Sequence, residues 1–313
     1  MIPEEEVIRF VDIHRSIIES VKPSFFEVTA AMAFDYFMRE KVDVAVIETG
    51  MGGRLDSTNI ITPVVSVITN IGHDHMDLLG DTFEKVAREK AGIIKKNIPV
   101  VIGETHPETA EVFTSAAGLA GSEISFADQS FRCLPADVTD DMEDKLFTVE
   151  SLKDGRKTNI ILPLGGNYQA KNIQTVFQLF SCLKGHYQIN EKTVKEGLGK
   201  VISNTGLMGR WQILKKQPLV ICDTGHNREG LEYVTRQLEK MNIKRMHIVL
   251  GFVSDKDLSL VLPLFPVKAQ YYFTKASVPR ALDEKILQKE AQTFGLSGEC
   301  YNTVDDAYKS ALS

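Results

Sequence analysis

The sequence predicts an α/β protein in which a mostly parallel sheet is followed by a smaller Rossmann-like α/β domain. Three observations predict this class. Apolar, β-branched runs alternate with helical patterns along residues 43–126, and the same alternation resumes after residue 218. Only residues 130–164 between them have the short, turn-separated runs of an antiparallel segment. The rhythm of strand and helix predicts a sheet covered on both faces.

The amino-terminal half supplies the elements of the first sheet. The patterns predict helices near 4–21 and 25–40, strands near 43–48 and 64–69, a helix near 82–95, a strand at 98–102, a helix at 107–119 and a short strand around 124–126. Asp81 and Glu84 have the spacing of a capping box at the start of the third helix.

The middle of the chain predicts an antiparallel appendage. Asp154-Gly155 separates two apolar runs, and this dipeptide is a strong hairpin signal. A helix then runs from Gly165-Gly-Asn167 to about Leu183. Residues 203–209 are rich in turn formers and are the best linker candidate.

The carboxyl-terminal part predicts a second series of strands and helices of roughly a hundred residues, within the usual size of a domain. Strands are expected at 219–223, 246–250 and 269–274, helices near 229–241, 256–264 and 283–294, and a last helix-like run from 304 to 312.

Composition limits the classes of function. The 313 residues allow two domains, and 43% of them are hydrophobic. The net charge of −6 and the lack of a basic stripe do not favour nucleic acid or an anionic membrane as a partner. The four cysteines form no C-x-x-C pair, which is typical of a reduced protein, and we expect a cytoplasmic location. The apolar runs are too short to span a bilayer.

The most informative segment is a strand that ends in a carboxylate. Val44-Ala-Val-Ile-Glu48 is followed at once by the glycine-rich turn Gly50-Met-Gly-Gly53. Ligands bind at the carboxyl ends of parallel strands, and a carboxylate there can reach a cation held on the phosphates of a nucleotide. The alternative is an ordinary strand-end turn with a solvated glutamate.

A second unit of the same kind follows. The strand at 64–69 closes on a loop with two histidines and two aspartates, His75 among them, and the next helix carries Lys90. Taken singly, His75 is explained as a loop residue that makes a hydrogen bond, and Lys90 as a solvated helix lysine paired with a glutamate. The recurrence of a strand and a polar loop favours a ligand site.

Together these motifs resemble the folylpolyglutamate synthase/dihydrofolate synthase family, which are ATP-dependent amide-forming ligases related to the Mur ligases. The spacing from Glu48 to His75 is 27 residues and from His75 to Lys90 is 15, as in that family. The motifs that carry the resemblance span essentially the whole chain: Glu48-Thr-Gly-Met-Gly-Gly-Arg-Leu-Asp-Ser-Thr-Asn59, Ile68-Thr-Asn-Ile-Gly-His-Asp-His75, Arg88-Glu-Lys-Ala-Gly-Ile-Ile-Lys95, Gly166-Asn-Tyr-Gln-Ala-Lys-Asn172, Gly209-Arg-Trp211 and Cys222-Asp-Thr-Gly-His-Asn227.

The resemblance implies a domain organisation. Residues 1–203 resemble a Mur-ligase-like ATP- and metal-binding central domain that is incomplete at its amino end, 204–209 a linker, and 210–313 part of a Rossmann-like glutamate ligase domain. The family also has a P-loop, G-x-x-x-x-G-K-[ST], around the ATP phosphates. Residues 1–313 contain no such motif, and Gly197-Leu-Gly-Lys200 lacks its leading glycine and its hydroxyl. We therefore expect an internal fragment of a ligase that is inactive by itself.

The resemblance makes Glu48 and His75 ligands of Mg²⁺ beside ATP, with two metal sites expected. Mg²⁺ prefers oxygen, which suits Glu48. Imidazole is a less usual ligand, and without the resemblance the pair would indicate a transition metal; Asp74 and Asp77 are rival oxygen donors. The resemblance further implies that Lys90 is carbamylated by CO₂ and supports the second metal, which requires a neutral, partly desolvated amine.

The nucleotide is assigned by the resemblance to residues of the second half. Asn172 would bind it with Gln169 as a weaker partner, although both residues could simply pack at a helix N-terminus. Arg210, Asp223 and His226 would bind it from the carboxyl-terminal domain, and His226 is also carried over as a catalytic residue. A guanidinium group suits phosphate because it makes two parallel hydrogen bonds.

For the acceptor substrate, the resemblance points to six residues: Phe25, Phe26, Glu27, Leu55, Asp56 and Ser57. Aromatic faces with a carboxylate suit a pterin, which is flat and carries amino donors. The two phenylalanines are explained equally well as core residues of an apolar helix. Asp255-Lys-Asp257 is a weaker candidate for contact with glutamate, with a solvated helix start as the alternative.

The implied reaction joins L-glutamate to a reduced folate or dihydropteroate at the expense of ATP, through an acyl phosphate. The expected partners are these small molecules, with neither nucleic acid nor membrane, and we expect a monomer. Two alternatives stay open. One is a homologue without a P-loop that binds a nucleotide or pterin without catalysis, and the other is a Mur-type ligase acting on a UDP-sugar peptide.

Overall fold

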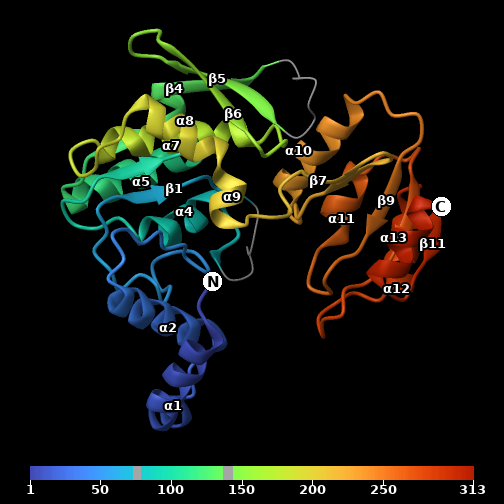
Figure 1. The fold of residues 1–313 in the computed structure, drawn as a ribbon, viewed down its shortest axis with the longest axis horizontal. Helices are drawn as coiled ribbons and strands as arrows, with labels where there is room; N and C mark the ends of the chain where they lie inside the picture. The colour runs from blue at the N-terminus through green and yellow to red at the C-terminus, as the bar shows by residue number, and fades with distance from the viewer. Residues whose placement is uncertain (73–78, 137–143) are drawn as a thin grey trace. The chain divides into compact units, whose positions relative to one another are not determined.

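The computed structural model describes residues 1–72, 79–136 and 144–313, which form two compact units. The first unit contains the described residues of 1–71 and 75–126 with 181–183, and the second contains those of 72–74, 127–180 and 184–313 (Figure 1). Within these residues, no helix combines the length and the apolar character needed to cross a membrane.

The first unit has two long helices and a small parallel sheet. The strand order is β1-β2-β3, and both pairings are parallel. The sheet packs against two helices through Val86 and Ala87 on one helix and Phe113 on the other. The elements are α1 (Glu4–Val21), α2 (Phe25–Glu40), β1 (Ser66–Ile68), α4 (Phe83–Ala91), β2 (Val100–Ile102), α5 (Pro107–Ala120) and β3 (Ile124–Phe126).

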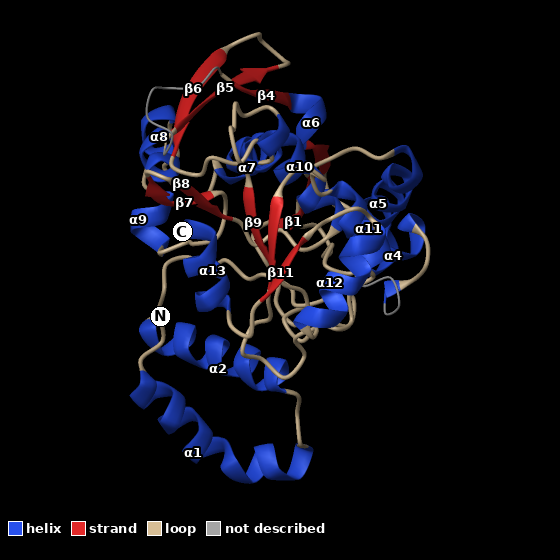
Figure 2. Ribbon diagram, turned by 90° about the vertical axis from the view of Figure 1, so that its right-hand side faces the viewer, coloured by secondary structure: helices blue, strands red, loops and turns tan. Residues whose placement is uncertain are grey.

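The helices α1 and α2 lie side by side and are joined by charge (Figure 2). Arg9 donates to Asp35 at 2.6 Å, and Arg39 pairs with both Asp35 (2.9 Å) and Glu6. Apolar burial contributes little, since α2 has no buried residue and α1 has only Phe10. An apolar surface on these helices therefore stays exposed.

The strand predicted at 43–48 is wrong. This segment is irregular, and the side chains of Val44 and Val46 are 55% and 91% exposed. A strand exists only when its backbone pairs with a neighbour, and no other described segment pairs with residues 43–48. The apolar residue pattern of this segment is that of a strand, but no described segment supplies the backbone hydrogen bonds that a strand needs.

The second unit begins with an antiparallel sheet of order β4-β5-β6, which confirms the predicted hairpin. Gly155 makes the turn at a φ of +70°, which suits glycine. Ala170 and Ile173 of α7 pack against Phe147 and Ile160 of the sheet. The elements are α6 (Ala127–Ser130), β4 (Phe131–Pro135), β5 (Lys145–Ser151), β6 (Lys157–Leu162), α7 (Gln169–Leu183, most of it in this unit), α8 (Glu191–Gly199) and α9 (Val201–Thr205).

The rest of the second unit contains a parallel sheet of order β11-β10-β9. Tyr271 and Phe273 belong to the core shared with α10, α11 and α12, while the alternate residue Tyr272 packs against Tyr301. The elements are β7 (Gln212–Lys216), β8 (Leu219–Cys222), α10 (Arg228–Glu239), β9 (His247–Leu250), α11 (Leu258–Val261), a 3-10 turn (Leu262–Leu264), β10 (Gln270–Phe273), α12 (Glu284–Thr293), β11 (Gly298–Cys300) and α13 (Val304–Leu312).

Some elements of this part differ from the sequence prediction. The strand predicted at 219–223 pairs antiparallel with β7, which was not predicted, and β11 was also missed. The candidate linker at 203–209 begins inside α9, because that helix continues until Gly206 ends it with a φ of +68°.

The glycine-rich loop of the first unit is held against the end of α4. The Arg54 N–H donates to the Glu89 carbonyl at 2.8 Å, and the Arg54 side chain pairs with the Glu89 carboxylate at 2.9 Å. Gly92 makes this approach possible, since a Cβ atom there would lie 2.3 Å from the Arg54 Cα. Asn59 adds a hydrogen bond to the Gly92 carbonyl at 3.0 Å.

Gly92→Ala is therefore expected to destabilise the protein by about 1–3 kcal/mol, the usual cost of overpacking. Gly118→Ala is the matched control, because a Cβ at this position in α5 meets open space; it should stabilise by about 0.5–1 kcal/mol. Urea unfolding followed by circular dichroism measures both. Equal stabilities of the two variants would contradict the close packing at Gly92.

Candidate functional site

The glycine-rich loop of the first unit is folded around the carboxylate of Asp56. Its Oδ2 accepts hydrogen bonds from the Gly50 and Met51 N–H groups, both at 2.9 Å, and its Oδ1 accepts from the Thr58 N–H at 3.0 Å and from the Thr58 hydroxyl at 2.5 Å. Burial acts to raise the pKa of Asp56, but these hydrogen bonds outweigh it and lower that pKa. The ionised carboxylate thus fixes the shape of the loop.

The structure brings part of the predicted acceptor set to this loop. The ring of Phe26 lies against Gly50, where a Cβ atom would be 2.4 Å from the ring. The Ser57 hydroxyl is buried and has no hydrogen-bond partner in the described part of the chain. Phe25 and Leu55 are largely exposed. Glu27 caps α2 instead, accepting from the Ser24 N–H at 2.6 Å.

The predicted metal ligands are described only in part. Glu48 presents an exposed carboxylate just before the loop, and a hard oxygen of this kind fits Mg²⁺. His75, Asp74 and Asp77 lie outside the described residues. Within the described ranges, no three His, Cys, Asp or Glu side chains gather as a metal cluster. Lys90 is half-buried in the last turn of α4, one residue after Glu89.

In the second unit, the carboxylate of Asp223 organises the turn after β8. Its Oδ2 accepts from the backbone N–H of Trp211 at 2.7 Å and from the Tyr168 hydroxyl at 2.9 Å. Its Oδ1 accepts from the backbone N–H of Gly225 at 2.8 Å. Asp223 therefore joins three segments of this unit: the start of α7, the turn before β7 and the turn before α10.

Arg210 lies in the turn before β7, and His226 lies in the turn before α10. The Thr224 N–H donates to the Gly209 carbonyl at 2.9 Å, and the guanidinium of Arg210 donates to the Thr224 hydroxyl. Nδ1 of His226 lies 3.1 Å from the Thr224 carbonyl oxygen. Both Arg210 and His226 are exposed, so the two turns present a permanent cation and an imidazole to solvent.

Gln169 and Asn172 lie at the start of α7 and are bonded to each other. The Asn172 amide donates to the Gln169 carbonyl oxygen at 2.8 Å, with Gln169 buried and Asn172 exposed. This confines both sequence-predicted amides to one helical turn, next to Tyr168 and its bond to Asp223.

Four residues near this network were not singled out by the sequence analysis: Lys145, Tyr168, Trp211 and Gln237. Tyr168 lies inside the motif Gly166–Asn172 and Trp211 inside the motif Gly209–Trp211, so their positions in these motifs could have indicated a role. Lys145 begins β5 and donates to the Gly165 carbonyl at 3.2 Å, and burial lowers its pKa. Gln237 lies on α10, and nothing in its sequence context indicates a role.

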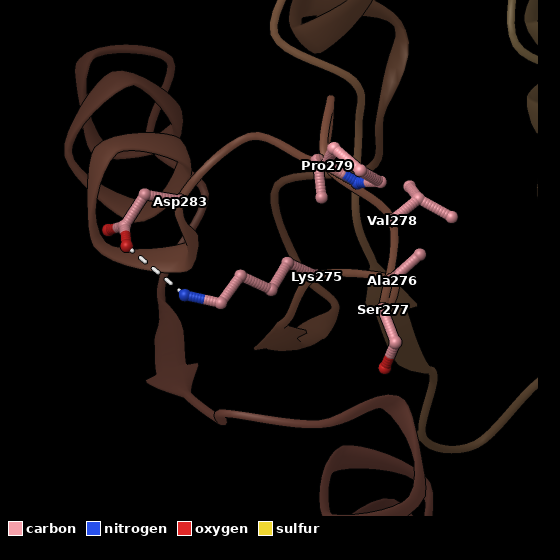
Figure 3. A pocket seen from close by; sticks show the side chains of 7 residues that line it. Lys275, Ala276, Ser277, Val278, Pro279 and Asp283 are labelled. Atoms are coloured by element: carbon pink, nitrogen blue, oxygen red, sulfur yellow. Dashed lines mark hydrogen bonds and ion pairs between the residues drawn. The ribbon is translucent and has the colours of Figure 1, made fainter.

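An open hollow of about 520 Å³ follows β10 (Figure 3). It is lined by residues 275–279 with Ala281 and Asp283, and it includes no residue that the sequence assigned to a site. Lys275 pairs there with Asp283 at 3.3 Å and Glu284 at 2.7 Å. Because these carboxylates neutralise the lysine, the hollow has no excess positive charge for an anionic ligand.

Comparison with known proteins places these features in a family. The Mur ligase middle domain matches residues 15–179, and the Mur ligase, glutamate ligase domain matches residues 209–313. Folylpolyglutamate synthase of Lacticaseibacillus casei is 31% identical over 90% of this chain and 67% of its own length.

Two solved structures have the same fold. Mycobacterium tuberculosis folylpolyglutamate synthase complexed with ADP and AMPPCP has a TM-score of 0.86 and 30% identity over 100% of this chain and 72% of that one. Escherichia coli FolC in complex with DHPP and ADP has a TM-score of 0.74 and 26% identity over 93% of this chain and 65% of that one.

The chain spans between 57% and 67% of the length of four bacterial relatives named folylpolyglutamate synthase or dihydrofolate synthase/folylpolyglutamate synthase. Both family domains match in order, and the motifs around Glu48, Asp56 and Asp223 lie on the loops described above. The chain belongs to the Mur ligase family, in its folylpolyglutamate synthase/dihydrofolate synthase branch.

Proposed function

We propose that residues 1–313 are part of a ligase that joins L-glutamate to a reduced folate or dihydropteroate with ATP. One observation carries the proposal: the fold of the folylpolyglutamate synthase complexed with ADP and AMPPCP covers the entire chain at a TM-score of 0.86. A second neighbour, in complex with DHPP and ADP, supports a nucleotide and a pterin-type compound as ligands of this fold.

The nucleotide would be bound by the second unit. Arg210 would bind its phosphates through two parallel hydrogen bonds, and the exposed amide of Asn172, held by Gln169, would contact its base or ribose. His226 would act from the turn before α10, which is bonded to the turn that carries Arg210 and where the Thr224 carbonyl orients its ring. Asp223 fixes this turn through its three hydrogen bonds.

The acceptor would lie at the glycine-rich loop. Phe26, which already packs on Gly50, and the exposed Phe25 offer aromatic faces to a pterin. The Ser57 hydroxyl offers the acceptor a hydrogen bond that no described residue uses. Leu55 would add apolar contact. Asp56 and Glu27 would act indirectly, because their carboxylates fix the loop and the start of α2.

Glu48 and His75 would hold Mg²⁺. When bound, Mg²⁺ supplies positive charge that offsets the charge developing on the phosphoryl group. Lys90 would support a second ion as a carbamate, which forms when CO₂ adds to its neutral amine with loss of a proton. The acceptor carboxylate attacks the γ-phosphorus with ADP leaving, and the glutamate amine then displaces phosphate from the acyl phosphate.

We further propose that the ligase needs a polypeptide segment beyond these residues. Residues 1–313 contain no P-loop motif, and the first unit exposes apolar residues that a complete domain would bury. They are spread over α1, α2 and the unpaired segment after them, and they include Ile13, Ile17, Phe25, Met38, Val44 and Val46. Residues 1–203 would then be a partial ATP- and metal-binding domain, and residues 210–313 would be part of a glutamate ligase domain. We expect the ligase to be a monomer in the cytoplasm.

The isolated chain of 313 residues should not release ADP in the presence of L-glutamate and tetrahydrofolate or dihydropteroate. The reason is that the backbone N–H groups and lysine of a P-loop, which bind the β- and γ-phosphates, are absent from it. A coupled assay of ADP release tests this, with a complete relative as the positive control. Glutamate-dependent release well above background would contradict the proposal.

In the intact ligase, Lys90→Ala should reduce kcat by about 10- to 100-fold, which is the usual cost of losing a group that supports a metal site. Acetate or another small acid should restore part of the activity by replacing the carbamate. Lys85→Ala is the control, because Lys85 lies on the same helix in an exposed pair with Asp81. Unchanged activity of the Lys90 variant would remove this residue from the site.

Arg210→Lys should weaken ADP binding to the chain about three- to tenfold, because an ammonium group keeps the charge but loses the paired hydrogen bonds. Arg228→Lys is the control, since Arg228 forms an exposed pair with Glu232 on α10. Isothermal titration calorimetry measures both affinities. The same affinity in the two variants would argue against a phosphate contact by Arg210.

A further inference from the structure

A short loop before α7 is bonded to the carboxyl-terminal part of the second unit. The Asn167 N–H donates to the side-chain oxygen of Gln237 at 2.7 Å, and the Gln237 amide donates to the Gly165 carbonyl at 2.9 Å. One residue later, the Tyr168 hydroxyl donates to Asp223. The loop is thus fixed by both α10 and the turn after β8.

The Tyr168 hydroxyl is suited to remain a hydrogen-bond donor. Burial and the negative charge of Asp223 both raise its pKa, so it stays protonated at neutral pH. Its ring is confined, since it packs edge-on against Tyr233 at 6.4 Å and lies over Gly166, where a Cβ atom would be 2.4 Å away. The hydroxyl therefore has one defined direction.

Trp211 meets the same carboxylate from the other side. It has a φ of +50°, which is unfavourable for a bulky residue, and it is buried with its ring against Gly165. The backbone N–H of Trp211 and the Tyr168 hydroxyl both donate to Oδ2 of Asp223. Strained residues persist where their surroundings fix them, often at functional sites.

We propose that Tyr168 is a positioning residue for the nucleotide. Through Asp223 it holds the turn that carries Arg210 in register with the first turn of α7, which carries Asn172. This inference rests on the nucleotide site of the proposed function. In this role Tyr168 acts on the nucleotide through its hydrogen bond to Asp223 and not by direct contact.

The test is a double-mutant cycle on ADP affinity, using Tyr168→Phe, Asp223→Asn and the double variant of the full 313-residue chain. Tyr168→Phe removes one oxygen atom and keeps the ring packing. Tyr233→Phe is the matched control, because it removes the same atom from the neighbouring ring. Trp211 is the only tryptophan of the chain, so its fluorescence reports on this contact.

Tyr168→Phe should weaken ADP binding about tenfold, on the scale of one hydrogen bond to a charged group. The same change in the Asp223→Asn background should have less than about a twofold effect, since residues that act through one another are not additive. In the absence of ADP, Tyr168→Phe alone should make Trp211 more accessible to acrylamide quenching. Tyr233→Phe should change neither readout.

The outcomes separate the two proposals. ADP affinity of Tyr168→Phe equal to that of the unaltered chain would overturn the positioning role and leave the nucleotide site intact. An equal loss in both backgrounds would also overturn it, because the effect would then not pass through Asp223. If the unaltered chain does not bind ADP, the proposed nucleotide site fails, and the positioning role fails with it.

Discussion

In each unit, the loop that carries the candidate site residues is built around the carboxylate of one aspartate. A tight turn leaves backbone N–H groups without a strand or helix partner, and such groups must be paired when they are shielded from water. Asp56 pairs those of Gly50, Met51 and Thr58, and Asp223 pairs those of Trp211 and Gly225. These bonds fix the backbone of each loop and thereby the positions of the exposed residues beside it, such as Leu55 in the first unit and Arg210 in the second.

The same need for a hydrogen-bond partner explains why residues 43–48 of the first unit form no strand. This segment has apolar, β-branched residues, but no other described segment pairs with it. The helices α1 and α2 are held by half-buried ion pairs with little apolar burial, and ion pairs that solvent still reaches contribute little stability. Under the proposed function, a polypeptide segment beyond these residues would pair with residues 43–48 and cover the exposed apolar side chains of α1 and α2.

The sequence predicted what depends on local pattern. The bounds of α2, the hairpin at Asp154-Gly155 and the strand at 124–126 were correct because capping, turn chemistry and β-branched runs are properties of neighbouring residues. The strand at 43–48 and the roles of Tyr168 and Gln237 depend on residues distant in the chain. Gln237 shows this most clearly, since its partners lie 70 and 72 positions away. The strand β7 was missed although its partner β8 follows after only two residues.

The hydrogen bonds of the two aspartates also decide what each can still do. A carboxylate has about four acceptor positions. Asp56 uses four of them within its own loop, so a direct bond to a pterin would require the loop to open. Under the proposed function, the Ser57 hydroxyl, which has no hydrogen-bond partner among the described residues, is the better contact for the acceptor substrate. Asp223 uses three and keeps one position on Oδ1. Under the proposed function it can therefore fix its turn and accept a hydrogen bond from a nucleotide at the same time.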